Sequence, residues 1–340
     1  MKVWMYKGGM KIVEKSGVGR AYEHQKLALK ERGIPFVTKF SLDFDVIQLN
    51  TIFPDSFFAT LLGKLMKKKV VYYAHSTMED FRKSFKGSDF FAPLFKKWIM
   101  LCYQMGDIII TPTQYSRELL LNYGIKTEIV SLSNGIDLNF YHQDKKLGEN
   151  FRGKYQYKDS DKVIMSVGHY IERKGIEDFA ELAKRMPEFQ FLWFGYTNMN
   201  LIPDKIRKII QLNLPNLHFP GYISREELRE AYCGSDLFLF MTHEETEGIV
   251  LLEALATKIP ILLRDIPIYE KWLEDKKQVY KARSMEDFEK SIREIVAGQV
   301  PLLTEEGYLV AYERNINGIG NELFEIYSSL LVTQTEIHLV

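Results

Sequence analysis

Short apolar runs alternate with longer amphipathic segments along the whole chain. The runs are rich in Val, Ile, Phe and Tyr, which predicts buried strands, whereas the segments between them repeat apolar residues at helical spacing. Strands that alternate with helices indicate an α/β protein built on parallel sheets. Strands are predicted at residues 2–6, 46–49, 70–74, 107–110, 128–132, 162–167, 191–195, 217–219, 236–241 and 259–263.

This pattern begins twice. A strand at 2–6 leads into a glycine-containing loop at 8–19 and a helix, and a strand at 162–167 leads into a second such loop at 168–175 and another helix. Strand, glycine loop and helix open a Rossmann-like unit. We therefore predict two Rossmann-like domains, at 1–150 and 151–315.

The stretch 243–256 holds the most informative residues. It follows the predicted strand 236–241 and becomes a proline-free helix that begins near Gly248. The free N–H groups and the helix dipole at such a start suit a phosphate or diphosphate. Glu245 precedes the helix and Glu253 lies within it, so their carboxylates flank this site about 8–12 Å apart. Two acceptors around a diphosphate site suit a nucleotide sugar.

The second glycine loop places cations before a helix. Arg173 and Lys174 directly precede the helix that carries Ile176 and Phe179 on its apolar face. Cations at a helix N-terminus oppose the dipole. A bound diphosphate would remove this conflict, so the two side chains are predicted phosphate ligands.

Composition indicates a folded two-domain protein. The 340 residues are 46% hydrophobic and 26% charged, with a net charge of zero. Residues 1–150 carry 22 basic against 15 acidic residues, and 151–340 carry 23 against 30, so the halves differ by sign. The basic half favours an anionic membrane or ligand, and no nucleic-acid-binding motif accompanies it. Two cysteines and no membrane-spanning run favour a cytoplasmic location.

Two motifs in the first half exclude other chemistries. Gly17 and Gly19 lack the third glycine and the later acidic residue of a dinucleotide-binding fingerprint. Asp43 and Asp45 have the spacing of a metal-binding D-x-D motif, but no further oxygen-rich cluster completes a site, so they are predicted to cap a strand. We expect no bound metal.

A histidine and a helix are further predicted in the first half. His75 ends the strand 70–74, at the edge where open α/β sheets bind ligands. The helix that begins at Asp55 is expected to bury its apolar positions, which are Phe57, Phe58, Leu61, Leu62 and Leu65.

The segment 79–97 interleaves aromatic and basic residues, with a helix expected from Pro93 onward. This mixture favours a lipid–water interface. The alternative is a loop buried beneath the domain interface. The residues predicted to contact a membrane are Phe81, Arg82, Phe85, Lys86, Phe90 and Phe91.

The Glu245-x7-Glu253 spacing, with Gly248 three positions after the first glutamate, resembles the signature of retaining GT-B glycosyltransferases of family 4. Glu247 stands where that family mostly has phenylalanine, a mild departure. The resemblance covers nearly the whole chain. It implies two domains that face a cleft and a C-terminal helix, 316–340, that crosses back to the first domain.

The resemblance also implies roles for the charged residues. Lys174 would bind the donor phosphates, with Arg173 in place of the arginine that the family usually has at the position of His169. Glu245 would hold the hexose hydroxyls and Glu253 the ribose. The UDP-sugar is a substrate, and neither a cofactor nor a metal is expected.

Further contacts follow from the same resemblance. His75 would lie beside the reacting sugar and position it against the acceptor. Backbone groups that would contact the donor belong to Gly17, Gly19, Gly221, Tyr222, Ile223, Gly248, Ile249 and Val250.

Segments 14–20, 75–82 and 173–179 resemble Gram-positive glycolipid synthases that add a second hexose to monoglucosyldiacylglycerol. This implies an α-hexosyltransferase that uses UDP-glucose or UDP-galactose, attached peripherally to the inner face of the membrane, with a diglycosyldiacylglycerol of the lipoteichoic-acid-anchor type as product. One alternative is a soluble family-4 transferase that makes polysaccharide or capsule. The other is a non-catalytic nucleotide-sugar-binding partner subunit.

Overall fold

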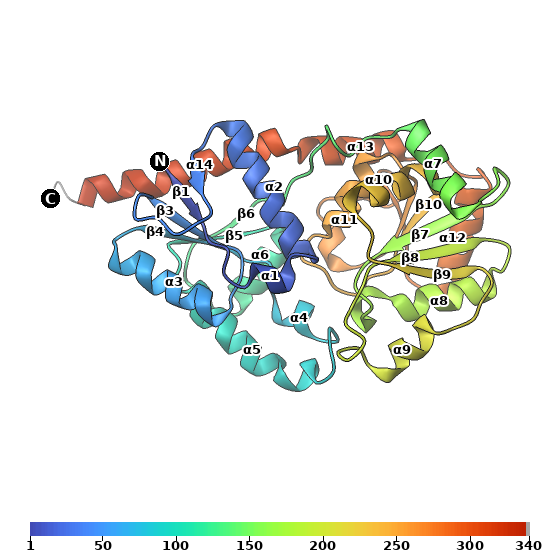
Figure 1. The fold of residues 1–340 in the computed structure, drawn as a ribbon, viewed down its shortest axis with the longest axis horizontal. Helices are drawn as coiled ribbons and strands as arrows, with labels where there is room; N and C mark the ends of the chain where they lie inside the picture. Colours follow the sequence, from blue (N-terminus) through green and yellow to red (C-terminus); the bar gives the residue numbers. More distant parts are fainter. Residues whose placement is uncertain (338–340) are drawn as a thin grey trace.

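The computed structural model describes residues 1–337, which form two domains, each built on a six-stranded parallel sheet (Figure 1). The first sheet has the order β2-β1-β3-β4-β5-β6 and the second β12-β11-β10-β7-β8-β9. The predicted α/β class with two Rossmann-like domains is confirmed. In the first domain the strands are β1 Val3–Met5, β2 Phe36–Val37, β3 Val46–Leu49, β4 Lys69–Tyr73, β5 Ile108–Thr111 and β6 Ile129–Ser131.

Helices cover both faces of each sheet, which is why the central strands are buried and read as continuous apolar runs. The first domain contains α1 Met10–Val13, α2 Gly17–Arg32, α3 Pro54–Leu65, α4 Met78–Phe81, α5 Ser88–Tyr103 and α6 Gln114–Asn122. The strands of the second domain are β7 Val163–Val167, β8 Gln190–Phe194, β9 Leu217–Gly221, β10 Leu237–Phe240, β11 Ile261–Arg264 and β12 Tyr280–Ala282.

The remaining helices are α7 Lys145–Tyr155, α8 Ile176–Arg185, α9 Asp204–Ile210, α10 Arg225–Gly234, α11 Ile249–Ala256, α12 Met285–Val296, α13 Thr304–Glu313 and α14 Ile316–Ile337, with 3₁₀ turns η1 Glu172–Lys174 and η2 Pro267–Tyr269. The predicted domain boundary at residue 150 falls inside α7, which packs against α10 of the second domain. Helix α14 leaves α13 and packs along α2 of the first domain (Figure 1). Residues 338–340 of the predicted C-terminal helix lie outside the described part.

Three predicted helices differ from the structure. Helix α2 begins at Gly17, because Ser16 caps it by accepting a hydrogen bond from the Val18 N–H at 3.2 Å, so the predicted loop ends before both glycines. Helix α5 begins at Ser88, five residues before Pro93. The apolar residues of α3 are not all buried, since this helix is apolar on more than the face that the sheet covers. The short edge strands β2 and β12 were not predicted.

The strand order fixes where a ligand site can form. The strand order of the second sheet reverses between β7 and β10, and open α/β sheets bind ligands beyond the carboxyl ends of the strands at such a switch point. The loops that leave β7 and β10 there are 168–175 and 241–248, the two segments that the sequence singled out.

Candidate active site

The two switch-point loops meet directly. The Lys174 ammonium pairs with Glu245 Oε1, although 71 residues separate them in the chain. The His243 N–H donates to the Arg173 carbonyl at 2.8 Å. Gly175 has φ of 80°, and a Cβ there would lie 2.2 Å from the Met241 carbonyl oxygen, so the close approach of the loops requires glycine.

Glu245 is a buried, ionised carboxylate. Its residue is 6% exposed. Burial raises the pKa of this group, but the positive charges of Lys174 and Arg173 outweigh burial and lower it. The carboxylate of Glu245 and the adjacent ammonium of Lys174 present an acceptor for hydroxyl groups and a donor for phosphate in one place.

Gly248 is the N-cap of α11, in agreement with the prediction that the helix begins near it. It adopts φ of 87° and ψ of 75°, and no side chain caps the helix. No acidic residue occupies the first turn of α11. The first-turn N–H groups, at Ile249 and Val250, are therefore suited to an anionic ligand.

Glu253 lies within α11 and is 1% exposed. Tyr141 donates to its Oε1 at 2.8 Å and Tyr232 to its Oε2 at 3.1 Å, while Arg20 Nε of the first domain lies 3.4 Å from Oε1. Burial raises the pKa of Glu253, and the charge of Arg20 opposes that effect. The Glu253 carboxylate, which is predicted to bind the ribose, thus already accepts hydrogen bonds from the protein. A ribose hydroxyl would have to bind this carboxylate alongside those donors.

Arg173 crosses to the first domain. Its Nη1 lies 2.9 Å from Asp80 Oδ1 and donates to the Glu244 carbonyl at 2.6 Å, while its Nε donates to Ser84 Oγ at 3.3 Å. Glu245 is more distant, at 4.0 Å. The Arg173 guanidinium therefore connects the 168–175 loop to the α4 segment. That Arg173 binds the donor phosphates stays a prediction.

Two histidines flank the loops. His75 Nε2 lies 2.9 Å from Asn50 Oδ1, and burial lowers the pKa of His75 to about 4, so the ring is neutral with Nδ1 as an acceptor. His169 Nδ1 lies 2.7 Å from the Tyr196 carbonyl, and burial lowers its pKa as well. A neutral His169 that donates through Nδ1 offers Nε2 only as an acceptor, unlike an arginine.

The first glycine loop faces the second domain. A Cβ at Gly19 would lie 2.3 Å from the Glu14 carbonyl oxygen, so this tight turn into α2 needs glycine, whereas Gly17 has open space around it. The Lys15 ammonium lies 5.2 Å from the centre of the Tyr222 ring. Tyr222 follows Gly221, whose φ is 86°, and is itself 51% exposed, while Ile223 packs against the core.

The predicted membrane segment divides into packed and exposed residues. Phe81 is half-buried and stacks on Phe95 with ring centres 3.9 Å apart, because the short helix α4 folds onto α5. Phe81 is therefore not exposed as the membrane prediction requires. Phe85 is 38% exposed and meets Phe81 edge to face. Exposed charged or apolar side chains are those of Arg82, Lys86, Phe90 and Phe91.

Helix α3 extends this exposed region. Phe58 and Leu65 are 66% and 82% exposed, contrary to the prediction that they are buried. Helices α3 and α5 are neighbours, since the rings of Phe57 and Trp98 lie 5.6 Å apart (Figure 1). We define the α3–α5 surface by its exposed apolar residues Phe58, Leu61, Leu65, Phe90, Phe91 and Leu94.

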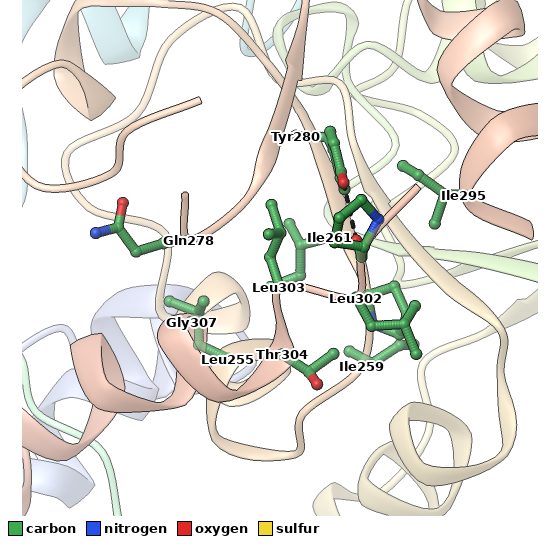
Figure 2. A pocket seen from close by; sticks show the side chains of 12 residues that line it. Leu255, Ile259, Ile261, Gln278, Tyr280, Ile295, Leu302, Leu303, Thr304 and Gly307 are labelled. Carbon is green, nitrogen blue, oxygen red and sulfur yellow. Dashed lines mark hydrogen bonds between the residues drawn. The ribbon is translucent and has the colours of Figure 1, made fainter. Parts of the chain in front are cut away.

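Two cavities differ greatly in size. A pocket of about 10 Å³ lies among Leu255, Ile261, Tyr280 and neighbouring apolar residues (Figure 2). That volume holds at most about one water molecule. A larger cavity of about 350 Å³ lies between the two domains. Its lining includes Glu247 of the 243–248 loop and Trp272.

Residues 1–337 contain no group of three or more His, Cys, Asp or Glu side chains arranged to hold a metal ion. Asp43 instead contacts the Lys2 ammonium at 2.8 Å, and Asp45 accepts from the Lys2 N–H at 2.8 Å, so both bind the N-terminal strand. In the same described residues, no helix is both long and apolar enough to cross a bilayer.

Several site residues were not predicted from the sequence. Arg20 directly follows the glycine motif, which is a usable signal, but Tyr141 and Tyr232 carry none because ordinary core tyrosines look the same. Asp80 and Asn50 were also missed. Their roles follow only from the partners that the fold brings to them.

Comparison with known proteins agrees with this geometry. Residues 148–307 match the family model "Glycosyl transferases group 1", and residues 20–140 match "Glycosyltransferase Family 4". A processive diacylglycerol alpha-glucosyltransferase of Acholeplasma laidlawii is 38% identical over 97% of this chain and 99% of its own length. An alpha-galactosylglucosyldiacylglycerol synthase of Streptococcus pneumoniae is 29% identical over 68% of this chain and 63% of its own.

Solved structures share the fold. Anabaena HepE, crystallised with UDP and glucose, is 14% identical and superposes with a TM-score of 0.79 over 97% of this chain and all of its own. A glycosyltransferase of Rickettsia africae has a TM-score of 0.70 at 15% identity, over 97% of this chain and 98% of its own. With the full-length relative and the paired Lys174 and Glu245 at the switch point, these matches establish that the chain belongs to the GT-B glycosyltransferases of family 4.

Proposed function

We propose that this glycosyltransferase moves glucose from UDP-glucose, with retention of the α configuration, to a diacylglycerol glycolipid. The observation that carries the proposal is the 38% identity, over nearly the full length of both chains, to a protein named as a processive diacylglycerol alpha-glucosyltransferase. That name favours glucose over galactose as the donor sugar. Monoglucosyldiacylglycerol is the acceptor that we propose, and diacylglycerol itself is the second candidate.

Lys174 and the N–H groups of Ile249 and Val250 would stabilise the leaving diphosphate, an electrostatic role. Glu245 would accept hydrogen bonds from the hexose hydroxyls, and Glu253 from the ribose. In the transfer, the bond from the sugar C1 to the phosphate oxygen breaks and a bond from C1 to the acceptor oxygen forms. The acceptor proton passes to the departing phosphate oxygen.

Three carboxylates around the site are already engaged by other side chains of the protein. Glu245 is paired with Lys174, Glu253 is held by two tyrosines, and Asp80 is paired with Arg173. A covalent nucleophile would need a free carboxylate at C1. These pairings favour attack by the acceptor on the same face from which the diphosphate leaves. The neutral His75 would accept a hydrogen bond at Nδ1 from the hydroxyl group of the glycolipid acceptor and so orient that hydroxyl.

The α3–α5 surface is the membrane-docking face that we propose. Helices α3 and α5 together expose these six apolar side chains and also basic residues such as Lys64 and Lys97. Each apolar side chain that leaves water contributes about 1.5–3 kcal/mol, and each basic residue about 1 kcal/mol at an anionic surface. This arrangement suits peripheral attachment to the inner face of the cell membrane and access to a lipid acceptor.

The test is transfer from radiolabelled UDP-glucose and, separately, UDP-galactose. The acceptors are vesicles of anionic lipid that contain diacylglycerol, monoglucosyldiacylglycerol or neither, and the products are separated by thin-layer chromatography. We expect a labelled diglycosyl lipid from UDP-glucose only, with an α linkage by NMR. Label released to water without a lipid product would keep the transferase and refute the lipid acceptor. Neither product would favour a non-catalytic nucleotide-sugar-binding subunit.

A further inference from the structure

The loop between β10 and α11 contacts both domains. Glu245 turns to Lys174 of its own domain, whereas its neighbours turn to the first domain. The Tyr115 hydroxyl donates to Glu244 Oε2 at 3.2 Å. The Thr246 carbonyl accepts from Thr113 Oγ1 at 2.8 Å, and from Ser116 Oγ at 3.1 Å. The segment that carries the predicted sugar-binding carboxylate is therefore held from the opposite domain.

Glu247 makes the most complete of these contacts. It is 1% exposed, and its carboxylate accepts three hydrogen bonds from the first domain. The Ser133 hydroxyl donates to Oε1 at 2.5 Å, and Asn134 donates to Oε2 from its backbone N–H at 3.0 Å and from Nδ2 at 2.7 Å. A carboxylate this deeply buried is tolerated only with such donors, and breaking the set strands a buried polar group.

The donors belong to the hinge between the domains. Residues 133–136 cross from the first domain, and within this segment Ile136 pairs with Asn315 of the return crossing. The Ile136 N–H donates to the Arg314 carbonyl at 2.9 Å, and the Ile316 N–H donates to the Ile136 carbonyl at 3.1 Å.

Neighbouring groups hold this crossing tightly. His24 Nδ1 lies 2.7 Å from the Gly135 carbonyl. A Cβ at Gly135, whose φ is 75°, would lie 2.9 Å from the Ile319 side chain. The segment 133–136 is thus held between α2 and α14. A group that binds Ser133 and Asn134 is therefore fixed relative to the first domain.

We propose that Glu247 is a positioning residue that fastens the loop of Glu245 to the interdomain hinge, so that Glu245 is set against Lys174 only while the two domains are held together. Its carboxylate is engaged by the hinge and is not a donor ligand. The activity readout rests on the proposed function, whereas the conformational readout does not. Misplacement of a reacting group by about 1 Å can cost about a hundredfold in rate.

The test compares Glu247→Ala, Glu247→Gln and Ser133→Ala. The matched control is Glu118→Gln, which breaks an exposed pair with Lys271 that also joins the domains. Turnover and KM are measured with UDP-glucose, and the Kd of UDP is measured by calorimetry. Spin labels at Lys30→Cys and Lys290→Cys, with Cys233→Ser, report the interdomain distance by pulsed electron resonance.

We expect Glu247→Ala to lower kcat by about tenfold to a hundredfold, to change the Kd of UDP less than about threefold, and to broaden the distance distribution. Glu247→Gln should stay within about fivefold, because its amide can accept from Asn134 and donate to Ser133 Oγ. Adding Ser133→Ala to Glu247→Ala should cost little more, since the hydrogen bond between Ser133 and Glu247 is already lost in Glu247→Ala. The control should behave as the unmodified chain.

Two results would overturn the proposal. One is a folded Glu247→Ala variant with unchanged kcat and an unchanged distance distribution. The other is a loss of UDP affinity that parallels the loss of kcat, which would make Glu247 a donor ligand. If Glu247→Ala does not fold, Ser133→Ala and Glu247→Gln decide by the same readouts. If no variant and no unmodified chain transfers sugar, the proposed function fails, while the distance distributions still decide the role of Glu247.

Discussion

Apolar side chains are usually buried and charged ones exposed. The switch-point site of the second domain and the α3–α5 surface of the first domain depart from this rule in opposite ways. At the switch point, the charged side chains of Lys174 and Glu245 are only 13% and 7% exposed. On the α3–α5 surface, Phe90 and Leu65 are each 82% exposed. A buried polar group or an exposed apolar patch is more informative than an ordinary core, because each is costly without a partner. The buried charges suit a diphosphate and sugar, and the exposed apolar side chains suit a lipid surface.

The two regions also lie on different domains. The charged site is built from two loops of one sheet, whereas the apolar surface is built from helices outside the other sheet. Changes at the first should affect chemistry with any acceptor, and changes at the second should affect only acceptors embedded in a bilayer.

The largest effect is expected from Lys174→Ala. Loss of an electrostatic group at the leaving diphosphate should lower kcat by about 10²–10³-fold, whether the acceptor is in a vesicle or in detergent. Steady-state kinetics in both settings measure it, with exposed Lys290→Ala as control. Turnover within about threefold of the unmodified chain would show that the diphosphate lies elsewhere.

The double variant Phe90→Ser/Leu94→Ser tests the α3–α5 surface. Loss of two apolar anchors should weaken vesicle binding by at least about tenfold and reduce lipid glycosylation in parallel, with UDP affinity unchanged. Vesicle flotation and calorimetry measure the two. Leu309→Ser/Tyr312→Ser, which removes similarly exposed side chains from α13, is the matched control. Equal flotation of both double variants would contradict a specific docking surface.

A smaller effect is expected from Glu253→Gln. A charge-assisted acceptor for the ribose hydroxyls becomes a neutral one, so the Kd of UDP should rise by about tenfold. Calorimetry with UDP and with uracil separates a ribose effect from a base effect, and exposed Glu313→Gln is the control. Intact UDP affinity in Glu253→Gln would remove Glu253 from the donor site.

The smallest effect concerns Glu244, whose pKa burial raises from 4.5 to about 7. Between these values the folded protein binds more protons than the unfolded chain, so stability falls as pH rises through this range. Glu244→Gln lacks this titration. The Tm of the variant minus that of the unmodified chain should therefore grow by a few degrees between about pH 5 and about pH 8. A constant difference would mean that Glu244 titrates normally.

Local pattern was enough for much of the fold. Apolar runs predicted the central strands and Gly248 predicted the start of α11, whereas the C-terminal helix α14 was expected from the family resemblance. These features can be predicted because buried strands, helix starts and apolar periodicity each depend on a few consecutive residues. Charge next to a helix start also indicated the Lys174 loop.

What the sequence by itself determined is therefore the central strands, the two domains and the two switch-point loops that carry the charged residues. Only the tertiary structure decided which apolar face of α3 is covered, that Phe81 stacks on Phe95, and that Glu253 is held by Tyr141. It also decided that Glu247, which the sequence marks only as a departure from its family, binds the hinge. Partners far apart in the chain are chosen by strand order and domain contact, and neither is encoded in a local window.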